Sequence, residues 1–263
     1  LEVETQIIMG LSSQIKNLTK CIYRTGIDIE DLVFSILATA EAVLSSKQKE
    51  LGVVVVDIGA ATTLLAVFEE GNVLHTAVLP IGSGHITNDL AIGLKTSIET
   101  AEAVKIDQAS ALAETLSKRE EVDLHKYSEY EVKGSFVYKR EIAEISEARM
   151  EEIFIMINDE LKKIDRDGKL PAGVVLTAGG AKLPHVVELA KKVFQLPVFL
   201  GLPTIKDLPI DKLNDPEYTT ALGLVMWFDK NVDSNSGFLS NMSSITQSTD
   251  KMKRWLKSLW PSS

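Results

Sequence analysis

The residues best suited to chemistry lie in a turn that follows a run of four valines, residues 53–56. The turn combines one carboxylate with small residues and hydroxyls: Asp57, Gly59, Ala60, Ala61, Thr62 and Thr63. Small residues let backbone N–H groups approach a phosphate, and threonine hydroxyls add donors. A carboxylate at a strand end can hold a metal ion, directly or through water. The pattern favours a phosphate and metal site, with a tight hairpin capped by an aspartate as the alternative.

A second turn of the same kind follows the apolar residues 173–176 and contains Gly179 and Gly180. Glycine-rich turns between a strand and a helix are favoured where a nucleotide approaches. A glycine turn needed only for packing is the alternative for this segment taken alone. Two such turns in one chain suggest the two walls of one cleft.

Strands and helices must carry these turns. The valine run suits a strand buried on both faces, and residues 64–68 and 73–79 extend it into a three-stranded meander. Residues 31–46 indicate a short strand followed by an alanine-rich helix. The remaining expected elements are strands at 173–176 and 198–200, strands with polar turns at 121–140, a helical stretch at 86–113, and helices at 11–25, 147–163, 186–194 and 218–228.

Composition narrows the class of protein. The 263 residues are 45% hydrophobic and 25% charged, as in globular proteins, and the net charge of -9 argues against nucleic-acid binding. One cysteine, Cys21, cannot form an internal disulfide, which fits a reducing cytosol. The four histidines show no metal-ligand spacing. No secretory signal opens the chain. The first residue is Leu1 and not Met, which indicates a fragment.

The last residues combine an apolar helical stripe with basic flanks. The stripe and its flanks are Met252, Trp255, Leu256, Leu259 and Trp260, with Lys251, Lys253, Arg254 and Lys257. A helix of this length, about 16 Å, cannot span a hydrocarbon core of about 30 Å. We therefore expect residues 250–263 to lie in an anionic membrane surface, behind a flexible polar linker at 229–249. A helix that packs back on the body or binds a partner is the alternative.

Several segments resemble known proteins. Residues 53–63 resemble the second phosphate motif of the actin and heat-shock chaperone superfamily, and residues 173–181 resemble its adenosine motif. Residues 75–82, 86–94 and 216–224 are similar to FtsA in particular, a family of bacterial actin-like proteins that tie the division ring to the membrane. The resemblance covers essentially the whole chain.

The resemblance implies an α/β fold, the actin-like (ribonuclease-H-like) ATPase fold, that binds ATP and Mg²⁺, with Asp57 holding the metal through water. Residues 1–51 would end the first lobe, and residues 52–80 and 147–228 would form the core of the second. The insertion at 81–146 would bind the C-terminal tail of FtsZ. The family also implies self-polymerisation, other division proteins as partners, and a peripheral location at the division site on the cytoplasmic face of the membrane.

Glu102 and Lys105 match the pair that hydrogen-bonds adenosine in related proteins, although an i,i+3 pair is also typical of a solvated helix face. The family pattern has glycines where this chain has Ala60, Ala61 and Ala178. A Cβ at positive φ costs about 1 kcal/mol. We therefore expect at most a weak ATPase, in which nucleotide acts as a structural switch.

Two other readings of the sequence remain open. One is an enzyme of the superfamily, a kinase or ATPase, which leaves the basic apolar tail unexplained. The other is an actin-like assembly protein of a pilus or secretion system, which would not bind FtsZ.

Overall fold

The computed structural model describes residues 7–128, 134–204 and 211–235, with side chains to Asp229. The chain divides into two compact units, residues 1–34 and 35–263. The first unit contains α1 (Ser12–Tyr23), which confirms the helix expected at 11–25 and buries none of its residues. The short strand expected at the start of 31–46 is wrong, because within the described ranges no strand pairs with this segment and the chain enters α2 (Ser35–Val43) directly.

The second unit is built on a five-stranded sheet with the order β3-β2-β1-β6-β7. The strands are β1 (Val53–Ile58), β2 (Thr63–Glu69), β3 (Asn72–Leu79), β6 (Val174–Thr177) and β7 (Val198–Leu200). The first three form the expected antiparallel meander, whereas β6 runs parallel to β1 on its other side. All six residues of β1 are buried, as its β-branched run predicts.

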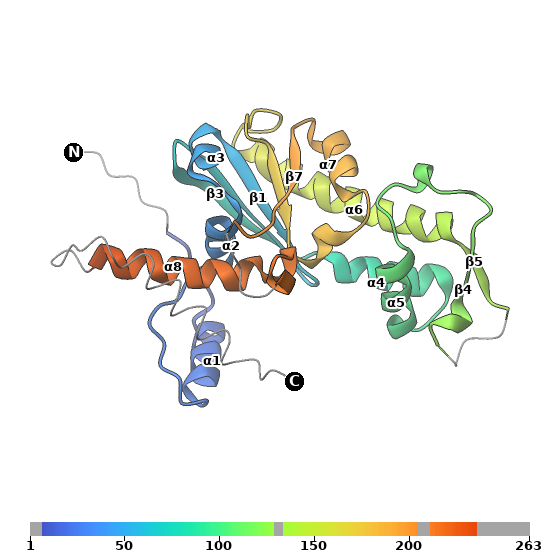
Figure 1. The fold of residues 1–263 in the computed structure, drawn as a ribbon, viewed down its shortest axis with the longest axis horizontal. Helices are drawn as coiled ribbons and strands as arrows, with labels where there is room; N and C mark the ends of the chain where they lie inside the picture. The colour runs from blue at the N-terminus through green and yellow to red at the C-terminus, as the bar shows by residue number, and fades with distance from the viewer. Residues whose placement is uncertain (1–6, 129–133, 205–210, 236–263) are drawn as a thin grey trace. The chain divides into compact units, whose positions relative to one another are not determined.

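Helices cover both faces of the sheet (Figure 1). On one face α2 packs along α8 (Thr219–Asn235), and α3 (Ser46–Leu51) leads into β1. On the other face lie α6 (Lys139–Lys163) and α7 (Val186–Phe194). The helix expected at 186–194 has these bounds, whereas α6 begins eight residues before its expected start.

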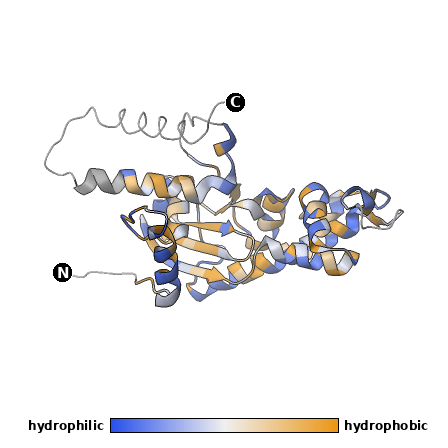
Figure 2. Ribbon diagram, turned by 90° about the horizontal axis from the view of Figure 1, so that it is seen from below, coloured by the Kyte–Doolittle hydropathy of each residue, from blue (hydrophilic) through white to orange (hydrophobic). Residues whose placement is uncertain are grey.

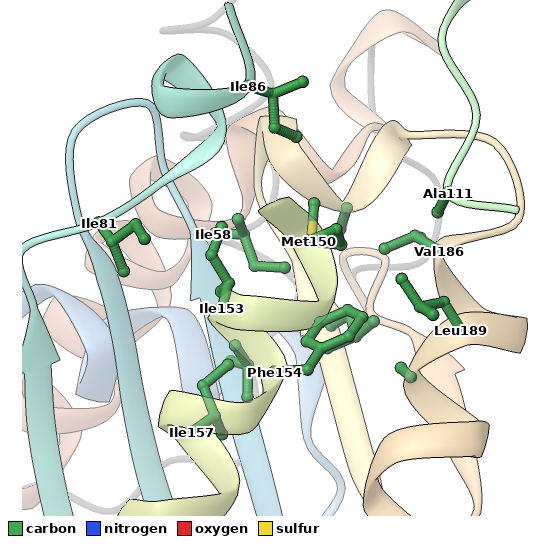
Figure 3. Packing of buried hydrophobic residues seen from close by; sticks show 14 of the residues in the cluster. Ile58, Ile81, Ile86, Ala111, Met150, Ile153, Phe154, Ile157, Val186 and Leu189 are labelled. Carbon is green, nitrogen blue, oxygen red and sulfur yellow. The ribbon is translucent and has the colours of Figure 1, made fainter. Parts of the chain in front are cut away.

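The core lies between the sheet and the α6–α7 layer. Figure 3 shows Ile153, Phe154 and Ile157 of α6 between β1 and α7, with Val186 and Leu189 facing them. The Phe154 and Phe194 rings lie 5.3 Å apart. Figure 2 shows hydrophobic residues gathered along the strands. Burial of these α6 side chains fixes the helix against the sheet that carries the two turns.

A smaller part of the second unit lies beyond the sheet (Figure 1). It consists of α4 (Ser83–Leu94), α5 (Ile98–Gln108), and the hairpin β4 (Glu121–Asp123) and β5 (Phe136–Tyr138), packed on the first half of α6. Residues 81–146, the range expected as an insertion, include α4, α5, the hairpin and the first turns of α6, and α6 continues without a break into the core. Short 3₁₀ helices are η1 (Ala113–Thr115), η2 (Leu124–Lys126), η3 (Gly179–Lys182), η4 (Asp211–Leu213) and η5 (Pro216–Tyr218).

The C-terminal helix α8 reaches Asn235, so it extends into the first residues of the segment expected as a linker. The rest of that segment, 236–249, and the expected membrane helix at 250–263 lie outside the described residues. Of the helices in the described ranges, none has the length and hydropathy needed to cross a bilayer.

Candidate functional site

Asp57 lies at the end of β1 where the sheet meets α2 and α8. Its Oδ2 accepts hydrogen bonds from Thr39 Oγ1 at 3.2 Å and Thr220 Oγ1 at 3.1 Å. The two hydroxyls are 2.8 Å apart. Burial raises the pKa of Asp57, and the bonds from Thr220 and Thr39 offset part of that effect. The carboxylate therefore joins the two helices on one face of the sheet.

The turn after Asp57 presents its two alanines to solvent. Gly59 donates its N–H to the carbonyl of Thr62 at 3.0 Å, which closes a tight turn around Ala60 and Ala61. Both alanines are exposed, and neither has positive φ. The backbone cost expected for these alanines is therefore absent. Thr63 lies inside, where its hydroxyl donates to the Ile81 carbonyl at 2.8 Å.

The first turn of α4 holds this loop in place. The N–H groups of Ser83 and Gly84 donate to the carbonyls of Gly59 and Ala60, each at 2.8 Å. A Cβ at Gly82 would lie 2.5 Å from the Gly59 carbonyl, so only glycine allows this approach. Contact with α4 fixes the phosphate-type turn beside the pocket described below.

The adenosine-type turn approaches the end of β1 equally closely. A Cβ at Gly180 would lie 2.4 Å from Ile58 Cγ2 and 2.8 Å from its carbonyl oxygen. Ala178, at φ 67 and ψ -176, occupies a region that is essentially restricted to glycine. The positive φ on which the expected backbone cost depends is therefore present at Ala178. These two turns, distant in the sequence, meet at the C-terminal ends of the neighbouring strands β1 and β6.

A pocket of about 320 Å³ opens beside the adenosine-type turn. Four of its lining residues are among those predicted from the sequence: Glu102, Lys105, Gly179 and Gly180. The others are Ser83, Ile86, Ile106, Lys182, Leu183, Pro184 and Glu217. The residues of the phosphate-type turn do not line this pocket. They connect to it through Ser83, whose hydroxyl donates to the Gly59 carbonyl at 3.1 Å.

One wall of the pocket carries the predicted Glu102 and Lys105 pair. Lys105 Nζ donates to Glu102 Oε2 at 2.7 Å and to Thr87 Oγ1 at 2.9 Å, and Thr87 also donates to Glu102. Partial burial raises the pKa of Glu102, but the bonds from Lys105 and Thr87 and the Lys105 charge outweigh it, so this pKa lies below its ordinary value. The lowered pKa keeps the Glu102 carboxyl ionised beside Lys105 on α5.

The opposite wall carries an ion-pair group that the sequence reasoning missed. Lys182 Nζ donates to Asp215 Oδ2 at 2.9 Å and Glu217 Oε1 at 3.0 Å. These two carboxylates raise the pKa of Lys182. The sequence gives little sign of this group, because Lys182 follows the glycine turn closely whereas Asp215 and Glu217 lie more than 30 residues along the chain.

The lining of the pocket combines apolar and charged side chains. Apolar side chains of Ile86, Ile106 and Leu183 lie between two walls of charged hydrogen-bonding groups, as ligand sites commonly require. A Cβ at Gly179 would meet only Glu217, at 3.9 Å, so the glycine backbone is open to a ligand. In the described ranges no group of three acidic, histidine or cysteine side chains could hold a metal ion.

Solved structures with a similar fold include one that is bound to ADP. MreB5 of Spiroplasma citri bound to ADP superposes with a TM-score of 0.64 at 16% identity, over 88% of this chain and 69% of that protein. The PilM–PilN type IV pilus biogenesis complex gives 0.58 at 16% identity, over 80% and 56%. The likeness confirms the expected actin-like α/β fold.

Sequence comparison identifies the family. FtsA of Pseudomonas aeruginosa is 35% identical over 264 residues, 98% of this chain and 63% of the relative. FtsA of Bacillus subtilis is 38% identical over 231 residues, 88% of this chain and 51% of the relative. The chain thus spans about half to two thirds of the length of these relatives. The family model for cell division protein FtsA matches residues 54–223. The chain therefore belongs to the FtsA family of cell division proteins.

Proposed function

We propose that this chain is the part of an ATP-binding division adaptor that recruits FtsZ polymers and attaches them to the membrane. The pocket between the Glu102–Lys105 pair and the Gly179–Gly180 turn carries the proposal. It supports a nucleotide whose base end lies near the ion pairs and whose phosphates lie toward Gly59, Ala60 and Ala61.

Bound ATP and Mg²⁺ would place the phosphates and the metal ion where the two turns meet. Asp57 would hold the metal through water, and the hydrogen bonds from Thr39 and Thr220 would keep its carboxylate oriented. The exposed alanines leave backbone N–H groups of the turn close to solvent. The strained Ala178 is consistent with weak turnover, so nucleotide would act mainly as a switch.

The FtsZ tail would bind the part of the chain around α4 and α6. A groove there is lined by Ile92, Ile145 and Ala148, with Arg149 and Asp89 paired beside it, Nη2 to Oδ1, at 2.9 Å. Ile92 is 77% exposed beside this groove, so its side chain is available to a bound peptide. An extended peptide with apolar side chains fits this groove.

Residues 250–263 would hold the assembly on the anionic inner face of the cytoplasmic membrane at the division site. Four basic side chains, at about 1 kcal/mol each near an anionic surface, and the apolar stripe give reversible binding. Self-polymerisation and contacts with other division proteins would complete the scaffold.

The first test is anisotropy of a fluorescent FtsZ C-terminal peptide titrated with the chain. We expect saturable binding in the micromolar range that is lost in Ile92→Glu. Ile98→Glu, the same substitution at another exposed isoleucine, should retain it. No binding by a chain that circular dichroism shows to be folded would contradict the FtsZ adaptor. Flotation with anionic liposomes that persists after deletion of 250–263 would contradict the membrane role of the tail.

A further inference from the structure

A second cavity lies at the other end of the sheet from the nucleotide pocket. Its volume is about 430 Å³, and α2, α3, the β2–β3 turn and α8 enclose it. Its apolar lining residues are Leu37, Leu44, Phe68, Val73 and Trp227. The indole Nε1 of Trp227 is buried without a hydrogen-bond partner among the described residues. Such a group costs free energy, so packing at this end of α8 is incomplete.

The cavity carries an excess of negative charge. Glu41, Glu50 and Lys49 line it. Lys49 is already engaged, because its Nζ lies 2.6 Å from Glu41 Oε1 and 5.1 Å from the centre of the Phe68 ring. Glu50 forms no ion pair within the described part of the chain. The cavity is therefore apolar with an unneutralised carboxylate at its edge.

We propose that residues 250–263 of the same chain dock in this cavity when no membrane is present. The segment offers the complementary chemistry, since Trp255, Leu256 and Trp260 are large and apolar while Lys253 and Lys257 are basic. A docked lysine would pair with Glu50, and an apolar side chain would complete the packing around Trp227. The same apolar stripe cannot lie in the cavity and in a lipid surface at once.

The chain is long enough for this return. From Trp227 to the end of α8 at Asn235 is about 12 Å at 1.5 Å per residue. Residues 236–249, as the flexible linker that their composition predicts, have a root-mean-square span of about 20 Å. A tether of that length gives an effective concentration in the millimolar range. Docking with a millimolar dissociation constant would thus occupy about half of the molecules, which makes it readily displaced by lipid.

Docking can be measured in the full chain without lipid. The chain has three tryptophans, and Trp227 is kept because it lines the cavity. Its fluorescence is measured in a chain that ends at residue 249 and is subtracted, which leaves the signal of Trp255 and Trp260. We expect acrylamide to quench them less than in a free peptide of residues 250–263, and Glu50→Lys to abolish that protection. Glu151→Lys makes the same charge change on the exposed outer side of α6 and should leave it intact. Equal quenching in chain and peptide, or protection that rises with protein concentration, would overturn docking within one molecule.

Competition with lipid, which rests on the proposed membrane role, is a separate measurement. Apparent vesicle affinity falls in proportion to the undocked fraction. We therefore expect Glu50→Lys to bind anionic vesicles about twofold more tightly than Glu151→Lys, which corrects for the added positive charge. Equal affinities would refute the competition. Absence of vesicle binding in every variant would instead refute the membrane role, while the quenching result would still decide docking.

Discussion

Replacement of Ala178 by glycine should stabilise the protein. At φ 67 and ψ -176 this alanine occupies a backbone region that costs roughly 1–3 kcal/mol for a residue with a Cβ. Glycine removes that strain but adds about 0.5–1 kcal/mol of unfolded-state freedom. The net gain is about 1 kcal/mol, which raises Tm by roughly 2–4 °C in a domain of this size.

The assay is thermal and urea unfolding followed by circular dichroism, in buffer without nucleotide. Ala181→Gly is the matched control, because Ala181 is buried in η3 without a positive φ. The same substitution there should destabilise by about 1 kcal/mol. If both changes destabilised equally, the adenosine-type turn would not be strained at Ala178, and the inferred weakness of the site would lose its structural basis.

Three other substitutions probe the site. Gly180→Ala should destabilise by about 1–3 kcal/mol in urea unfolding, because its Cβ would overlap Ile58; unchanged stability would show that the two turns can separate at no cost. The pKa of Asp57 is raised by burial, so its contribution to stability is present below pH 3.8 and falls as pH rises through the higher folded value. The unfolding free energy should therefore fall less steeply with rising pH in Asp57→Asn than in the unaltered protein. The same slope in both proteins would contradict the raised pKa. The pKa of Glu102 is lowered, so its contribution to stability is present above pH 4.5 and is lost as pH falls from 4.5 through the lower folded value. The Tm difference between the protein and Glu102→Gln should shrink over that range. A constant difference would mean that the stabilisation by Glu102 does not come from its charge.

The sequence predicted the centre of the sheet well. A run of four valines and the hairpin turns after it have few other interpretations, and the meander has the expected pairing. The segment at residues 31–34 was mispredicted, because a short apolar run is equally compatible with a strand and with the entry to a buried helix. The start of α6 was missed because its first turns are rich in charge and expose one side, although Ile142 and Ala143 are buried.

The candidate site was predictable only in part. Glu102 and Lys105 were found through their spacing on one helix and the family resemblance. Lys182 and Glu217 were missed, because ordinary surface charges acquire a partner only when the chain folds. Thr63 was assigned to the ligand side of the turn, yet its hydroxyl bonds inside; neither composition nor spacing shows which of two adjacent threonines turns inward.

The single helix α6 has a mechanical consequence. Its 25 residues make a rod of about 37 Å that begins beside β5 and ends against the sheet. Buried side chains anchor it at both ends, from Ile142 to Leu161. A force on the part of the chain around α4 and α5 would therefore be transmitted along α6 to β1 and its neighbours, because α6 is one unbroken helix over its whole length.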